Sequence, residues 1–191
     1  MSNLPRILLA TLCGLVLAAG VHIAVVFMAP SFAENDAFGR LQDTLTEDQA
    51  QIVSSPGGGA TWLPLPDPAT AVAACAFDLS DGPVRVTAKT GQDFLSFSFH
   101  TKTRGVFFAV TDRAAIRGEL ELVVMTPRQL DEARAAEDEN EPNRDVRIVA
   151  PQEQGYIVVR VAAPYPSERA QAEEAAKAVT CTVDEEEDEA S

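Results

Sequence analysis

The sequence predicts an α+β protein, with one N-terminal transmembrane helix followed by an exported domain that has a mainly antiparallel β-sheet and two or three helices. Three observations predict this fold. An uncharged apolar run, Ile7 to Met28, is long enough to cross a bilayer. Between residues 84 and 162, short segments alternate apolar and polar side chains between turn residues, which is typical of strands. Helix start signals stand at Thr126 and Ser167.

The predicted anchor, Ile7 to Met28, contains no Asp, Glu, Lys or Arg. As a helix of about 22 residues it spans about 33 Å, slightly more than the hydrocarbon core of a bilayer. The lipid bilayer is therefore its predicted partner. Arg6 precedes the run, whereas Glu34 and Asp36 follow it. The positive-inside rule then predicts a cytoplasmic N-terminus, residues 1–6, and places the rest of the chain across the membrane.

A cleaved signal peptide is the alternative interpretation of this run. Ser31-Phe32-Ala33 resembles a small-x-small cleavage site. The apolar run is longer than the usual signal core, however, and Pro30 and Phe32 fit such a site poorly. An uncleaved anchor is favoured, and either interpretation exports the domain.

The composition sets limits on partners and on domain organisation. The 191-residue chain has a formal net charge of −14 at pH 7, so we expect nucleic acid to be repelled. Residues 29–60 are expected to form a juxtamembrane stalk with a glycine-rich linker, and residues 61–183 one α+β domain. The acidic end, residues 184–191, is expected to be a solvated, disordered tail.

Two cysteines lie outside the anchor, Cys75 and Cys181, near the two ends of the predicted domain. In an oxidising compartment such a pair can form a disulfide, and we predict this bridge. Two buried thiols that never meet are the alternative. The sequence contains no CxxC motif or Cys/His cluster that would indicate zinc, and neither a metal nor a cofactor is expected.

The region after the anchor begins with a short amphipathic helix or stalk, because Phe38, Leu41 and Leu45 recur at helical spacing. Residues 54–59 include three consecutive glycines. No Gly-Lys-Ser/Thr follows them, so a flexible linker is preferred to a phosphate-binding loop.

The next segment is expected to enter a helix. Asp67 is interpreted as its N-cap, Pro68 as its first residue and Cys75 as its approximate end. Trp62 is interpreted as a plug in the core or at its edge rather than as a platform for a ligand.

The strands are expected to form an antiparallel meander followed by a second hairpin, because the connections are short. The meander consists of Val84 to Ala88, Phe94 to His100, Val106 to Thr111 and Glu119 to Met125. The hairpin consists of Val146 to Ala150 and Tyr156 to Ala162, with a turn at residues 151–155.

Two helices accompany these strands. Thr126 is the predicted N-cap of the first, and Gln129 completes a capping box. This helix is expected to end near Ala136. The second helix is expected from Ser167 to Val179.

His100 is the only histidine outside the predicted anchor, and it shares the polar face of its strand with Ser98. A nucleophile–base pair needs a serine within hydrogen-bond distance and a carboxylate behind the ring. Residues i and i+2 of a strand lie about 7 Å apart, so this serine would require a bent geometry. No nucleophile elbow is present. We therefore assign no catalytic residue and expect that the protein is not an enzyme.

A set of basic side chains clusters around the predicted strand ends and forms a candidate anion-binding patch. Its members are Arg85, His100, Lys102, Arg104 and Arg113. Ordinary pairing with the many surface acids is the alternative. Residues 137–143 form an acidic loop, but their spacing is not that of an EF-hand, so calcium is not expected there.

Several motifs recur in the order found in one known family. They are Cys75 to Leu79, Gly82 to Val86, Phe107 to Arg113, Val124 to Leu130 and Pro151 to Tyr156. With the late cysteine, this pattern resembles the short membrane-anchored branch of the proteobacterial domain of unknown function 1254. The turn from His100 to Arg104 and the acidic tail depart from the family pattern.

The resemblance implies a single-pass protein of the bacterial inner membrane with a periplasmic β-rich domain. It also implies association with a companion membrane-anchored protein, because longer relatives carry both domains on one chain. It implies no activity. The leading hypothesis is therefore a periplasmic domain that acts as an envelope interaction module. The alternatives are a periplasmic domain that binds a small ligand or anion and, more weakly, an envelope hydrolase that uses His100.

Overall fold

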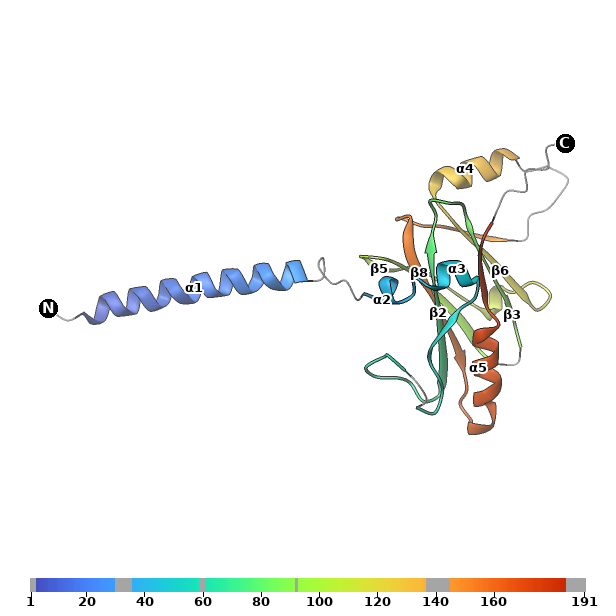
Figure 1. Cartoon of the computed structure of the whole chain (residues 1–191), viewed down its shortest axis with the longest axis horizontal. Helices are drawn as coiled ribbons and strands as arrows, with labels where there is room; N and C mark the ends of the chain where they lie inside the picture. The colour runs from blue at the N-terminus through green and yellow to red at the C-terminus, as the bar shows by residue number, and fades with distance from the viewer. Residues whose placement is uncertain (1–2, 30–35, 59–60, 92, 137–144, 185–191) are drawn as a thin grey trace. The chain divides into compact units, whose positions relative to one another are not determined.

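A computed structural model describes residues 3–29, 36–58, 61–91, 93–136 and 145–184 (Figure 1). The chain divides into two compact units, Met1–Asp36 and Ala37–Ser191. The first unit contains helix α1, Leu4–Met28, which is long and apolar enough to cross a membrane. None of its residues is buried within the structure. The predicted apolar helix is therefore confirmed, and an N-terminal signal sequence would also meet these criteria of length and hydropathy.

The second unit contains two β-sheets (Figure 1). The five-stranded sheet has the order β1-β2-β8-β4-β5. Its strands are Gln51–Ser54, Thr70–Asp78, Gln154–Ala162, Leu95–Thr101 and Gly105–Thr111, in that order. The four-stranded sheet has the order β7-β6-β3-β9. Its strands are Val146–Val149, Glu119–Met125, Val84–Lys89 and Thr180–Val183. Of the pairings, β6 with β7 is parallel and the others are antiparallel.

The inner faces of the two sheets share one hydrophobic core. Phe97 and Ile157 contribute from the five-stranded sheet, and Val86 and Leu122 from the four-stranded sheet; each is at most 1% exposed. Helix α5, Arg169–Lys177, contacts β2 and β8 and adds two buried alanines to this core. The predicted α+β class with antiparallel-rich sheets is confirmed.

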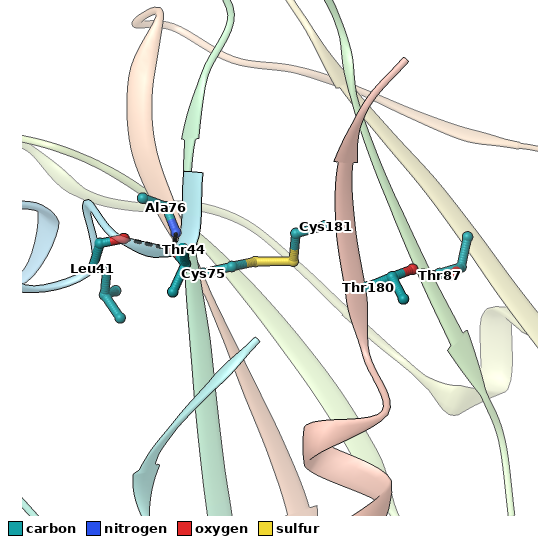
Figure 2. Close-up of a disulfide and its surroundings, with 7 residues drawn as sticks. All are labelled: Leu41, Thr44, Cys75, Ala76, Thr87, Thr180 and Cys181. Carbon is teal, nitrogen blue, oxygen red and sulfur yellow. Dashed lines mark hydrogen bonds between the residues drawn. A yellow bond between two sulfur atoms is a disulfide. The ribbon is translucent and has the colours of Figure 1, made fainter. Parts of the chain in front are cut away.

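A second, smaller core lies on the outer face of the five-stranded sheet. The short helices α2, Ala37–Arg40, and α3, Thr44–Glu47, pack there through Phe38 and Leu45, and Leu41 of the turn between them is also buried in this core. The Thr44 hydroxyl donates to the Leu41 carbonyl at 2.6 Å and accepts from the Ala76 amide of β2 at 2.8 Å (Figure 2). Residues 37–54 therefore belong to the folded unit rather than to a separate stalk, because their apolar side chains cover this face of the sheet.

The prediction of a helix that ends near Cys75 is wrong, because this segment forms strand β2. Residues Ala71 to Phe77 are all buried, since the inner face packs against the main core and the outer face against α2 and α3. A strand buried on both faces loses its polar alternation and cannot be distinguished from a helix by periodicity. Asp67 does act as a local cap, since its carboxylate accepts from Ala69 N at 2.9 Å and from the Thr70 hydroxyl at 3.0 Å. The turn that it closes leads into a strand.

The predicted strands are confirmed, and β4 pairs antiparallel with β5 as the meander requires, but the rest of the predicted pairing is wrong. The structure assigns β3 and β4 to different sheets, so the four strands form no single meander. The second hairpin is also absent among the described residues, since β7 pairs in parallel with β6 while β8 pairs with β2 and β4. Helix α4, Pro127–Ala136, makes the crossover that a parallel pair needs. A short connection keeps two consecutive strands close in space, but it does not determine which sheet each strand joins.

Helix α4 begins as predicted. The Gln129 side chain accepts from Thr126 N at 2.8 Å, and the Thr126 hydroxyl accepts from Gln129 N at 3.2 Å. Gln129 also donates to the Leu79 carbonyl at 3.0 Å, which ties the helix start to the end of β2. Helix α5 lies within the range predicted for the last helix. Beyond it, Asp184 is the one residue of the predicted acidic tail that the structure describes.

Candidate functional site

The predicted disulfide between Cys75 and Cys181 is confirmed. Cys75 lies in β2 of the five-stranded sheet and Cys181 in β9 of the four-stranded sheet, with 6.6 Å between their Cα atoms (Figure 2). Both side chains are buried in the shared core. The bond therefore joins the two sheets covalently across the inside of the domain. Cys13, in α1, is free.

The candidate anion patch is not assembled as one surface. Arg85 lies in β3 of the four-stranded sheet, where its Nε and Nη2 atoms donate to the two carboxylate oxygens of Asp184 at 3.1 and 2.8 Å. Asp145 lies 3.8 Å from the same guanidinium. These hydrogen bonds with Asp184, opposed by burial, leave the pKa of Arg85 above its ordinary value. Arg85 thus belongs to an ion-paired cluster, which was the alternative interpretation.

The other members of the patch separate into two groups. His100, Lys102 and Arg104 lie at the junction of β4 and β5, whereas Arg113 lies beyond the opposite end of β5, in the turn Asp112–Ala114. The ammonium of Lys102 donates to Gln154 at 3.1 Å and lies 4.6 Å from the ring centre of Phe38. Anion binding by these residues stays a prediction.

His100 sits in a polar cluster on the outer face of the five-stranded sheet. Its Nε2 atom lies 3.0 Å from Ser98 Oγ, which also accepts from Arg160 Nη1 at 3.1 Å. The pairing of β4 with β5 shifts register beside His100, where Phe107 of β5 is the extra residue, whereas β4 keeps a regular register with β8. The ring stacks on Tyr156 at 4.7 Å between centres with an interplanar angle of 12°.

Burial is the main cause that lowers the pKa of His100 from its ordinary value, and the positive charge of Arg160 adds to it. The imidazole is therefore neutral at pH 7. No described carboxylate accepts a hydrogen bond from this ring, so among the described residues the Ser98–His100 contact lacks the third member of a nucleophile–base arrangement.

In the wild type, the folded state binds the His100 proton more weakly than the unfolded chain does. The stability of the domain therefore falls as the pH drops through the ordinary histidine range.

We expect Arg160→Gln to raise the pKa of His100 toward its ordinary value, although not to reach it, because burial remains. NMR titration of the His100 ring in a His22→Gln background measures the pKa. Arg134→Gln, an exposed position on α4, is the control. An equal His100 pKa in both variants would contradict the assigned effect of Arg160.

A pocket of about 230 Å³ adjoins this cluster. Its floor is the outer face of β2 and β8, and its walls are α2 and the loop that follows β1. Most lining side chains are apolar, while His100 and Arg160 stand among the polar ones. Trp62 lines the pocket and is 37% exposed, and the Arg40 guanidinium lies 5.2 Å from its ring centre. The sequence suggested that Trp62 fills a place in the core or at its edge, and this exposure agrees with the edge rather than with the interior.

The sequence interpretation missed two residues of this site, Tyr156 and Arg160. They occupy alternate positions of β8, together with Val158, so all three project from the same face. That periodicity was visible in the sequence. What it did not indicate was that α2 and the loop around Trp62 cover part of this face and leave a pocket.

A second unusual surface is the outer edge of β5, with which no described strand pairs. This strand ends the five-stranded sheet, and Gly105–Thr111 contains neither a charged residue nor a proline. Val106 is 58% exposed, and Phe107 and Phe108 are half-buried against Phe99, with ring centres 6.3 and 5.8 Å away. Native edge strands are usually protected by charge, proline or a covering segment.

Within the described ranges, no group of three or more His, Cys, Asp or Glu residues is arranged to hold a metal ion. The acidic loop considered for calcium, residues 137–143, lies outside the described residues.

Comparison with solved structures shows the fold. The VPA0106 protein from Vibrio parahaemolyticus matches with a TM-score of 0.54 at 12% sequence identity, over 81% of this chain and 34% of that chain. The chain therefore spans about a third of that structure. A putative uncharacterized protein from Burkholderia cenocepacia matches with a TM-score of 0.45 at 16% identity, over 75% of this chain and 38% of that one. No curated protein matches the sequence.

The family model described as protein of unknown function DUF1254 matches residues 48–183. The match begins just before β1 and ends with β9, so it includes both sheets and the disulfide. It covers most of the sequence, and the chain accordingly belongs to the DUF1254 family.

Proposed function

We propose that this protein is a single-pass protein of the bacterial inner membrane, with a cytoplasmic N-terminus and a periplasmic domain that acts as an envelope interaction module. The apolar helix α1 and the buried disulfide support export and membrane attachment. The observation that supports an interaction role is the outer edge of β5, which contains no charged residue and pairs with no described strand.

The edge of β5 is suited to strand addition by a partner. An edge strand presents unpaired backbone N–H and C=O groups, and an extended segment can pair with them. Val106 and Ala109 are exposed on β5 and add apolar contact area beside those groups. A charged surface would discourage such pairing, and this strand has none of that protection although the whole chain carries a net charge of −14.

The proposed occupant is an extended segment of a companion membrane-anchored protein. In the larger Vibrio relative, the matched fold is only 34% of the chain, so that fold has covalently attached neighbours there. A separate chain would supply such a neighbour here. Anchoring both proteins in one membrane raises their effective concentration and allows a modest interface to remain occupied.

We propose a binding role rather than catalysis. The Ser98 hydroxyl accepts a hydrogen bond from Arg160, no described carboxylate accepts one from the His100 ring, and the lowered pKa of His100 makes it a weak base. An envelope hydrolase that uses His100 remains the weaker alternative. A hydrolytic activity that the wild-type protein has and that His100→Ala lacks would favour this alternative.

Cross-linking of the full-length protein in native membranes tests the module. We expect one anchored protein to be recovered in near-equal amount with the wild type, and at least about tenfold less with Val106→Lys, because a lysine on the edge disfavours strand addition.

Val149→Lys is the matched control. Val149 is an exposed valine, 42% accessible, on the edge strand β7 of the other sheet. Recovery should not change in this variant. Equal recovery with Val106→Lys and Val149→Lys would reject β5 as the docking surface, and no specific recovery with the wild type would reject the interaction module itself.

A further inference from the structure

The pocket beside Trp62 is formed by elements that are distant in the sequence. Val72 and Ala74 of β2 and Val158 of β8 form its apolar floor. Leu41, which directly follows α2, and Leu63, in the loop after β1, contribute to its walls. The pocket therefore belongs to the folded domain itself.

Small side chains create the space. Ala74 on the floor and Ala37 on the wall each leave room that a larger residue would occupy. The resulting volume is about 230 Å³. An apolar cavity of about 150 Å³ holds benzene, which has six carbon atoms. By proportion, this pocket accommodates about nine or ten non-hydrogen atoms, which is the size of an eight-carbon acyl group.

One end of the pocket is polar and positively charged. Arg160 donates one hydrogen bond to Ser98, and its planar guanidinium has further donors. None of the residues that line the pocket is Asp or Glu. Arg40, stacked on Trp62, adds a second positive charge beside it. In a chain with a net charge of −14, this local excess of positive charge is unusual.

We propose that the pocket binds a medium-chain monocarboxylate, with the alkyl chain over the apolar floor and the carboxylate at Arg160. A guanidinium and a carboxylate form charge-assisted hydrogen bonds of matched geometry. The neutral His100 ring, stacked on Tyr156, closes the polar end without competing for the anion. This inference does not rest on the proposed docking role of β5.

Trp62 makes the proposal directly testable, because it is the only tryptophan of the chain and lines the pocket. The full-length protein in lipid nanodiscs is titrated with 8-bromooctanoate, whose bromine quenches indole fluorescence on contact. We expect saturable quenching with a Kd below about 1 mM. Shortening the chain should weaken binding by about fourfold per methylene group removed.

Charge recognition is tested with 8-bromo-1-octanol, which has the same chain without the carboxylate. We expect the alcohol to bind about tenfold more weakly than the acid to the wild type. Arg160→Gln should weaken the acid about tenfold and leave the alcohol unchanged. Arg134→Gln, the exposed position on α4, should alter neither.

Val158→Phe places a larger side chain on the pocket floor and should weaken both probes. Quenching that rises linearly without saturation would overturn the proposal, since it indicates partition into the lipid. Equal binding of acid and alcohol to the wild type, or equal effects of Arg160→Gln and Arg134→Gln, would overturn it as well, because the site would then not recognise a carboxylate.

Discussion

Replacing Cys181 by serine is expected to lower the free energy of unfolding of the exported domain by about 4 kcal/mol. Cys75 and Cys181 are separated by 106 residues, and a disulfide that closes a loop of that length removes roughly 4–5 kcal/mol of chain entropy from the unfolded state. Because both sulfur atoms lie in the shared core, the substitution also leaves a polar hydroxyl among apolar side chains. Urea denaturation of the full-length protein, followed by circular dichroism, measures the loss.

Cys75→Ser should give nearly the same loss, and the double variant should lose little more, because either change removes the same bond. Cys13→Ser is the control, since Cys13 is a free thiol in α1. A reducing agent should reproduce the effect in the wild type. Identical unfolding curves for oxidised and reduced wild type would contradict a stabilising role of the bridge.

The second large effect is expected at Gly155, where substitution by alanine should destabilise the domain by about 3 kcal/mol or more. Gly155 lies in β8, between Phe77 of β2 and Thr101 of β4. A Cβ atom there would overlap with the backbone oxygen of His100 and with the Phe77 ring, whose Cε1 atom would be 2.8 Å away. The carbonyl is held in the sheet and Phe77 is fully buried, so neither can move aside.

Gly91→Ala is the matched control for Gly155→Ala. Gly91 is exposed, has no positive φ angle, and has no heavy atom within 4 Å of the added Cβ. Its substitution should change stability little, within about 0.5 kcal/mol. Thermal unfolding followed by circular dichroism compares the two variants. A Gly155→Ala midpoint equal to that of Gly91→Ala would show that the sheet can rearrange around this position.

Local sequence signals predicted the elements well where a single face is buried or a cap is formed. Strand β3 alternates throughout and β6 does so in its first half, and the Thr126–Gln129 box specifies the start of α4 by hydrogen bonds between near neighbours. The signals failed for β2, because burial on both faces removes the polar residues that reveal a strand. Gly155 was similarly expected in a turn, whereas it permits the close contact between β8 and Phe77.

Sheet membership and the pocket depend on contacts between distant segments, which no local pattern encodes. The disulfide was predictable because only two cysteines lie outside the apolar run. The sequence analysis grouped Arg85 and His100 in one basic patch, but the two residues lie in different sheets. Arg160 becomes a site residue only because the segment around Trp62 folds back over the same face as β8.

The Cys75–Cys181 bond also determines how the domain responds to mechanical force. If α1 is held in a membrane and a partner pulls on the domain, tension enters the folded unit through Ala37. Strand β1, α2, α3 and the first half of β2 precede Cys75, whereas every other strand except the end of β9 lies inside the covalent ring. Tension can extend the 37–74 segment by at most about 130 Å before it meets that ring. The bond thus acts as a mechanical stop that protects most of both sheets from unravelling.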